Sequence, residues 1–206
     1  MPGVTLTIDG RTARVPEGTS ILDAARRVGV KLPTMCHVNG CKPRAVCRMC
    51  VVALGGSLRL VPSCATTVTE GMQVQTDTPE VETARKLLME FMLAEHGECD
   101  DPNCAIERLA RQLGVYSTRF QMDKSLQEDD FSSKFITVDP ENCILCDRCV
   151  QACGKDQQVI VRAGRGRSVA ISFDTGLSMR DAACTDCGDC LSVCPAGALA
   201  EAGSDV

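Results

Sequence analysis

The stretch CILCDRCVQAC, residues 143–153, decides the fold of the C-terminal part of the chain, and CTDCGDCLSVC at residues 184–194 repeats its spacing. Both runs read C-x2-C-x2-C-x3-C, and Pro195 follows the second. In such a run three thiolates two residues apart bind three irons of one cubane, and the fourth cysteine points away to another cubane. The pair of runs therefore predicts a bacterial-type ferredoxin domain with two [4Fe–4S] clusters.

Each predicted cluster takes three cysteines from one run and one from the other. The first set is Cys143, Cys146, Cys149 and Cys194, and the second is Cys184, Cys187, Cys190 and Cys153. Zinc is the alternative metal, because C-x2-C pairs also occur in zinc ribbons. A zinc site needs four thiolates of its own and gives no reason for a repeated three-plus-one pattern, so iron–sulfur clusters are favoured.

A second group of cysteines lies near the N-terminus, where Cys36, Cys47, Cys50 and Cys64 follow the spacing C-x10-C-x2-C-x13-C. Three ligands on one loop and a fourth on a returning strand indicate a [2Fe–2S] cluster, although the plant-type spacing is C-x4-C-x2-C. Cys41 lies inside the loop and could take the place of Cys64. That choice would leave Cys64 without a role, so we predict Cys64 as the ligand and Cys41 as a bystander thiol.

The sequence around these cysteines predicts an α+β protein. Residues 4–8 and 11–15 read as a hairpin about an Asp-Gly turn, 21–28 as a helix with one apolar face, and 51–54 and 58–61 as strands. This order lays the helix across a mixed sheet. Further along we expect helices at 80–94 and 105–113, a polar connector from 117 to 133, and a hairpin around Gly164–Gly166.

The composition favours metal as the element that holds the fold together. Fifteen of the 206 residues are cysteine and none is tryptophan. The odd cysteine total and the tight spacings argue against disulfides, and we expect reduced thiols in a cytoplasmic protein. Lys and Arg number 22 against 27 Asp and Glu, a net charge of −5 that argues against nucleic acid as a partner. No secretory signal and no apolar run of about 18 residues is present, so no transmembrane segment is expected.

Three segments, PTMCH at 33–37, CRMCVV at 47–52 and PSCA at 62–65, resemble the N-terminal part of the G-type subunit family of NADH–quinone oxidoreductases. Diaphorase iron–sulfur subunits of soluble NAD-reducing hydrogenases, NAD-linked formate dehydrogenases and iron-only hydrogenases share this part. The likeness continues through residues 143–155 and covers nearly the whole chain. It implies a β-grasp ferredoxin fold for residues 3–77, in agreement with the pattern above.

The resemblance and the patterns together predict four parts. They are a [2Fe–2S] domain at 1–78, a helical segment at 79–116, a connector at 117–136 and a domain with two [4Fe–4S] clusters at 137–206.

Members of this family hold a further [4Fe–4S] cluster between the two domains, bound by one histidine and three cysteines. The corresponding stretch here, HGECDDPNC, begins at His96 and keeps two cysteines. The resemblance makes His96, Cys99 and Cys104 candidate ligands of a third [4Fe–4S] cluster. Asp100 or Asp101 could complete the set, since carboxylate oxygen can bind iron. The alternative is that the cluster is lost and the remaining residues cap helices.

These features indicate an electron-transfer subunit without catalytic residues of its own. Iron–sulfur clusters change oxidation state one electron at a time, and the sequence contains no motif for a hydride donor, a molybdopterin or a nickel–iron site. The resemblance implies two partners in a larger NAD(H)-linked oxidoreductase. One is a flavin subunit that binds NADH, and the other is a catalytic metalloenzyme subunit of the hydrogenase or formate dehydrogenase type.

The end of the chain soon after its second ferredoxin run favours a separate small subunit. The alternative function is a free-standing polyferredoxin that carries electrons among several partners. A third hypothesis, an enzyme that uses an incompletely ligated middle cluster, requires turnover by the isolated chain.

Overall fold

The computed structural model describes residues 3–55, 59–97, 99, 104–123, 135–153, 159–173 and 184–202. The chain forms two compact units, Met1–His37 with Pro43–Met89 and Val38–Lys42 with Glu90–Val206. Asp100 and Asp101, named above as possible ligands, and most of the expected connector lie outside the described residues.

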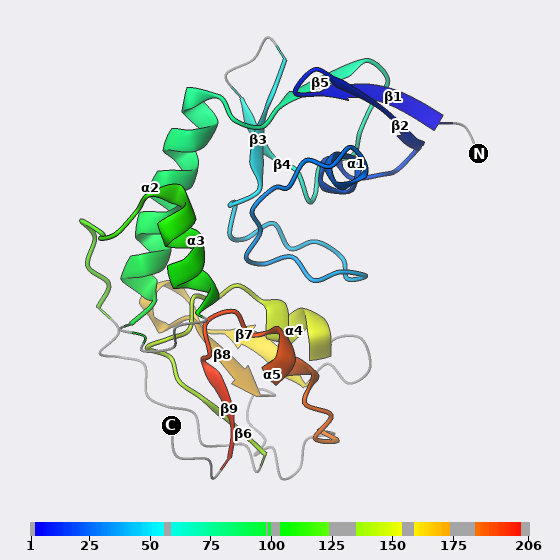
Figure 1. Ribbon diagram of the computed structural model, residues 1–206. Coiled ribbons are helices and arrows are strands. Elements are labelled where there is room, and N and C mark those ends of the chain that lie inside the picture. The colour runs from blue at the N-terminus through cyan, green and yellow to red at the C-terminus, as the bar shows by residue number, and fades with distance from the viewer. Residues whose placement is uncertain are drawn as a thin grey trace. The chain divides into compact units, whose positions relative to one another are not determined.

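A five-stranded mixed sheet forms the first unit (Figure 1). Its strands are β1 (Gly3–Ile8), β2 (Arg11–Pro16), β3 (Val51–Leu54), β4 (Leu60–Pro62) and β5 (Met72–Gln75), in the spatial order β2-β1-β5-β3-β4. β1 and β5 are parallel, and the other neighbours are antiparallel. The α+β class is confirmed, but β5 is absent from the sequence-based prediction. This strand is short and, of its four residues, Val74 alone is fully buried, so its pattern is weak.

The predicted hairpin forms between β1 and β2, and its turn explains why Asp-Gly is found there. Asp9 and Gly10 have φ angles of 47° and 79°, as the two central residues of a type I′ turn require. The Asp9 carboxylate also accepts hydrogen bonds from the backbone N–H and the hydroxyl of Thr76, at 2.8 and 2.6 Å. These bonds tie the hairpin tip to the end of β5.

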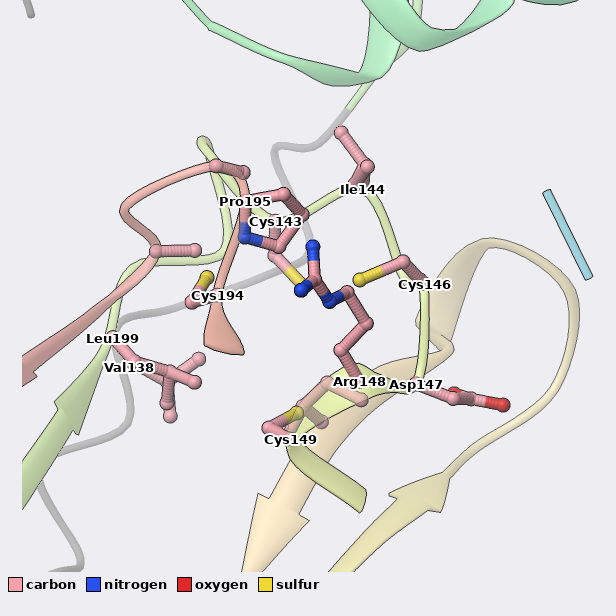
Figure 2. Close-up of a pocket in the computed structure, with 13 residues that line it drawn as sticks. Val138, Cys143, Ile144, Cys146, Asp147, Arg148, Cys149, Cys194, Pro195 and Leu199 are labelled. Carbon is pink, nitrogen blue, oxygen red and sulfur yellow. The ribbon is translucent and has the colours of Figure 1, made fainter. Parts of the chain in front are cut away.

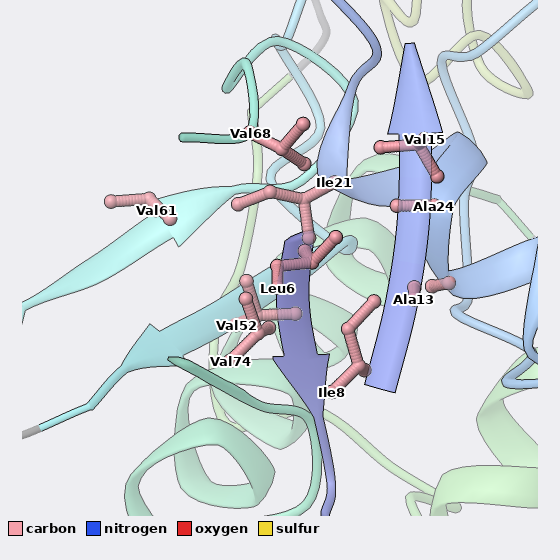
Figure 3. Packing of buried hydrophobic residues seen from close by; sticks show 11 residues of the cluster. Leu6, Ile8, Ala13, Val15, Ile21, Ala24, Val52, Val61, Val68 and Val74 are labelled. Atoms are coloured by element: carbon pink, nitrogen blue, oxygen red, sulfur yellow. The ribbon is translucent and has the colours of Figure 1, made fainter. Parts of the chain in front are cut away.

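The helix α1 (Ile21–Arg27) covers the sheet and closes the core of the first unit (Figure 3). Ser20 caps its N-terminus, because the backbone N–H of Asp23 donates to the Ser20 hydroxyl at 3.1 Å. Gly29, at a φ of 76°, follows its C-terminal end. The core combines aliphatic side chains from the helix and the strands, among them Leu6, Ile8, Ala13, Val15, Ile21, Ala24, Val52, Val61, Val68 and Val74.

The second unit contains short helices and two small antiparallel sheets. Its elements are α3 (Ala105–Leu113), β6 (Ile136–Val138), α4 (Arg148–Cys153), β7 (Ile160–Ala163), a 3-10 turn (Gly166–Ser168), β8 (Ala170–Phe173), α5 (Asp189–Val193) and β9 (Leu199–Glu201). The long helix α2 (Pro79–Glu95) begins in the first unit and ends in the second. α4 packs against α5 and β7, and β6 pairs with β9.

The helices at α2 and α3 and the β7–β8 hairpin agree with the sequence-based prediction. The β6–β9 pair was not expected, because its two strands have three residues each and lie far apart in the sequence. Within the described ranges, none of the helices has the length and apolar character needed to cross a bilayer.

Candidate metal centres

Four thiols of the first unit form two close pairs. The Cys47 thiol donates a hydrogen bond to the Cys36 sulfur, which lowers the pKa of Cys36 to about 6 and raises that of Cys47. Cys64 and Cys50 form the second pair in the same way, and the pKa of Cys50 is lowered to about 5. The Cys64 thiol also interacts electrostatically with Cys36 and Cys47, so the two pairs lie near each other. Two neighbouring pairs of thiolates fit two irons that each take two cysteines.

Cys41 belongs to different surroundings from these four thiols. It lies in the Val38–Lys42 segment of the second unit, where its Sγ is 3.6 Å from the carbonyl oxygen of Gln151. The structure therefore brings together the thiols of the predicted [2Fe–2S] set, including Cys64.

The loop before β3 turns its backbone amides toward the sulfurs. Ala45 and Arg48 have φ angles of 54° and 57°, in the left-handed region that non-glycine residues rarely adopt. The backbone N–H of Met49 donates to the Cys47 sulfur, and those of Val46 and Cys47 donate to Cys36. Such a nest of N–H groups stabilises thiolates and the negative charge of a cluster bound by them.

A buried arginine adds positive charge beside the same thiols. Arg85 on α2 is 8% exposed, and its Nη1 and Nη2 donate to the carbonyls of Thr76 and Val51 at 2.9 and 2.8 Å. Burial lowers the pKa of the guanidinium, and its attraction to the Cys50 thiolate opposes that shift. Val51 directly follows Cys50, so this contact fixes the charge close to the site.

The second unit contains two cavities, each lined by four cysteines. Cys143, Cys146, Cys149 and Cys194 face the first, as Figure 2 shows, and Cys153, Cys184, Cys187 and Cys190 line the second. These are the two crossed sets that the sequence predicts. The empty space in the two cavities, together with their openings to solvent, is about 360 and 310 Å³.

The helix α4 connects the two cavities. Cys149 near its start lines the first and Cys153 at its end lines the second. α5 has the matching arrangement, since Cys190 on the helix lines the second cavity and Cys194, its C-cap, lines the first. This crossing is the structural form of the three-plus-one spacing.

The ligand loops of the two runs share their backbone conformation. Leu145 and Asp147 have φ angles of 52° and 62°, and the equivalent Asp186 and Gly188 have 56° and 72°. Three of these four residues are not glycine, so the loop holds a conformation that costs free energy at each of them. The same conformation in both loops indicates that both bind the same kind of group, and a [4Fe–4S] cubane is such a group.

Burial disfavours the ionised form of three of these thiols. It raises the pKa of Cys146 to about 12 and that of Cys190 to about 11, and it raises the pKa of Cys149 as well. Hydrogen bonds from the backbone N–H groups partly oppose this rise in pKa: Arg148 donates to the Cys146 sulfur, and Leu191 donates to the Cys190 sulfur. Thiols that are costly to ionise alone become thiolates when bound to metal.

A third group consists of His96, Cys99 and Cys104, whose ligand atoms all lie within 4.8 Å of one another. His96 follows the last residue of α2, and Cys104 is the N-cap of α3. The Nε2 of His96 is 3.2 Å from the Cys104 Sγ, and its Nδ1 is 3.2 Å from the carbonyl oxygen of Asn142. The structure thus gathers the three candidate ligands of the middle segment.

Comparison with known protein families agrees with these donor sets. Residues 2–79 match the 2Fe-2S iron-sulfur cluster binding domain family, and residues 142–198 match the 4Fe-4S dicluster domain family. The chain is an iron–sulfur protein. Its two domains and their cysteines fit one [2Fe–2S] and two [4Fe–4S] clusters.

Whole-chain comparisons confirm the resemblance stated from the motifs. The iron–sulfur protein is 36% identical to the NADP-reducing hydrogenase subunit HndD of Solidesulfovibrio fructosivorans, over 98% of this chain and 36% of that protein. It is 34% identical to a G-type subunit of NADH-quinone oxidoreductase from Rhizobium meliloti (strain 1021), over 95% of this chain and 24% of that protein. It therefore spans about a third or less of the length of these curated relatives.

A solved structure covers nearly the same extent as this iron–sulfur protein. A chain in the crystal structure of an NAD+-reducing [NiFe]-hydrogenase in the H2-reduced state aligns with a TM-score of 0.86 and 27% identity. The alignment covers 98% of this chain and 88% of that one.

Proposed function

We propose that the chain is an electron-transfer subunit of a cytoplasmic, multi-subunit NAD(H)-linked oxidoreductase. It relays single electrons between a flavin subunit that binds NADH and a catalytic metalloenzyme subunit of the hydrogenase or formate dehydrogenase type. Two curated relatives that are named as subunits of a hydrogenase and of a quinone oxidoreductase support this role.

The observation that carries the proposal is the pair of crossed cavities joined by α4. Cys149 and Cys153 are four residues apart on one helix, so their Cα atoms are separated by about 6 Å along its axis. Clusters with ligands on the same short helix are joined by a single packed element through which electrons can pass. An isolated structural metal would not need this arrangement.

The proposed ligands follow the donor sets. Cys36, Cys47, Cys50 and Cys64 bind the [2Fe–2S] cluster, Cys143, Cys146, Cys149 and Cys194 bind cluster one, and Cys184, Cys187, Cys190 and Cys153 bind cluster two. The clusters supply the one-electron chemistry. The chain contributes burial, backbone N–H donors to sulfur and nearby charges, which set the potential at each site.

One nearby charge pair distinguishes cluster one from cluster two. Asp147, 2% exposed in its side chain, lies between Cys146 and Cys149, and the Arg162 Nε donates to its Oδ1 at 2.8 Å. Arg162 also donates from Nη2 to the carbonyl of Leu145. Leu145 and Asp147 both have left-handed backbone conformations, and Arg162 bonds to both of them. The guanidinium therefore stabilises the strained ligand loop and neutralises its buried carboxylate. Gly188, the equivalent of Asp147 in the second run, carries no charge.

We expect Arg162→Gln to lower the reduction potential of one [4Fe–4S] cluster and leave the other clusters unchanged. The variant leaves the Asp147 carboxylate without this guanidinium, and a buried negative charge disfavours the arrival of an electron. Potentiometric titration followed by EPR measures the change. Arg26→Gln, which breaks the exposed pair with Asp23, is the control and should have no effect. An unchanged potential in Arg162→Gln would show that the pair has no electrostatic role.

The proposed function is tested by purifying the tagged chain from its own cells without oxygen. We expect a flavoprotein and a metalloenzyme to elute with it, and NADH to reduce its clusters in this complex. NADH should not reduce the same chain purified alone, because the chain has no proposed hydride-accepting group. A monomer that elutes alone and accepts electrons from several unrelated reductases would instead identify a free-standing polyferredoxin.

A further inference from the structure

The structure presents its sulfur and nitrogen donors in three different geometries. The thiols of the [2Fe–2S] set form two hydrogen-bonded pairs, which suits two irons with two ligands each. The cubane sets surround cavities and interact through charge, as Cys149 does with Cys143, Cys146 and Cys194. Among the described residues, His96, Cys99 and Cys104 are the one group of three or more His, Cys, Asp or Glu whose donors all lie within 4.8 Å.

This compactness matches a single metal ion. Two donors on one tetrahedral zinc are separated by about 3.3–3.8 Å, given bonds of about 2.0–2.3 Å. The His96 Nε2 and the Cys104 Sγ are 3.2 Å apart, so small shifts give both atoms a bond to one ion. Ligands of a cubane bind different irons and point outward from its corners, which spreads the donors farther apart than the irons themselves. Among the described residues, neither of the cysteine sets that line cavities has three donors as close together as this triad.

The histidine is already oriented as a metal ligand. His96 is 5% exposed and its Nδ1 lies 3.2 Å from the carbonyl oxygen of Asn142. Histidines that bind metal commonly donate the second ring N–H to such a carbonyl, which leaves the other nitrogen free to bind the ion. A hydrogen bond between His96 and Cys104 joins two of the three groups, whereas one ion would engage the Cys99 sulfur as well, which lies within 4.8 Å of both.

We propose that His96, Cys99 and Cys104 bind one divalent ion, zinc, in place of a third cubane. One imidazole and two thiolates form a donor set that zinc accepts, with the fourth position filled by water or another group. The family's cluster needs three cysteines, and this stretch supplies two. A single ion needs no further thiolate, so the proposal accounts for the missing cysteine.

The position of the site gives the ion a structural role. It lies where the end of α2 meets the start of α3 and the segment that leads to Cys143. The backbone N–H of Gly97 donates to the Glu141 carbonyl at 3.0 Å, next to the contact between His96 and Asn142. An ion here therefore fixes three segments at one point, directly before the first ligand of cluster one.

The test measures metals and sulfide in the whole protein, purified without oxygen. We expect about one zinc per chain beside about ten irons, the latter from one [2Fe–2S] and two [4Fe–4S] clusters. Zinc-edge X-ray absorption should give two sulfurs at about 2.3 Å and one imidazole nitrogen at about 2.0 Å. Both measurements are independent of electron-transfer activity.

Variants assign the ion to the triad. His96→Ala and Cys99→Ser should each lose the zinc and keep about ten irons, while Cys41→Ser, the matched cysteine control, keeps both. Cys99 is half-buried, so its variant remains informative if His96→Ala fails to fold. About fourteen irons per chain, with about four lost in either variant, would overturn the proposal in favour of a third cubane. Zinc that is absent, or that survives both substitutions, would also overturn it.

Discussion

Replacing Cys64 with serine is expected to remove the [2Fe–2S] cluster, whereas replacing Cys41 with serine leaves it in place. The Cys64 thiol pairs with that of Cys50 and interacts with the other pair of the site. Without it, one iron keeps a single thiolate, and a serine hydroxyl is a harder and more weakly acidic ligand than a thiol. Cys41 contacts the Gln151 carbonyl through its sulfur and lies in the other compact unit.

The measurement is iron content together with EPR of the dithionite-reduced protein, prepared without oxygen. Cys64→Ser should lose about two irons and the [2Fe–2S] signal, with both [4Fe–4S] signals intact. Cys41→Ser has the same chemical change at a half-buried thiol and serves as the control. Loss of the [2Fe–2S] signal in Cys41→Ser, with its retention in Cys64→Ser, would assign Cys41 as the ligand.

The cysteine sets could be predicted from the sequence because the chemistry of clusters fixes short, local spacings. A three-plus-one run predicts which thiols bind the same cluster, and those thiols line the same cavity in the second unit. The α1 helix and the β1–β2 hairpin could also be predicted from the sequence, because a serine cap and an Asp-Gly turn act within a few residues.

Features that depend on distant pairing could not be predicted in this way. β5 joins the sheet through a parallel contact with β1, and its alternating polar pattern gives little local signal. β6 and β9 form a sheet from strands at opposite ends of the dicluster domain. The Asp147–Arg162 pair likewise joins a ligand loop to a strand. Asp147 occupies a position that the spacing of the first cysteine run leaves open, and Arg162 belongs to no recognisable motif.

The middle segment shows the limit of a family resemblance. The resemblance draws attention to His96, Cys99 and Cys104, but what a histidine and two cysteines bind depends on how close their donors come. The contact between His96 and Asn142 joins residues far apart in the sequence, so no spacing rule contains it. The short distances among the three donors favour one ion, and the sequence does not contain these distances.

The largest expected loss of iron follows from the crossing of ligands between the two runs. If Cys194 completes cluster one, Cys194→Ser should remove the same EPR signal as Cys146→Ser, and each variant should lose up to about four irons. If Cys153 completes cluster two, Cys153→Ser should match Cys187→Ser instead. The physical reason lies in α4 and α5, which each present one cysteine to either cavity.

The four variants distinguish crossed ligation from a model in which each run binds its own cluster. In the uncrossed model Cys153→Ser would match Cys146→Ser, and Cys194→Ser would match Cys187→Ser. Cys146 and Cys187 are therefore internal references, because both models assign them to the cluster of their own run. Crossed ligation couples the clusters mechanically as well, since moving α4 shifts a ligand of each.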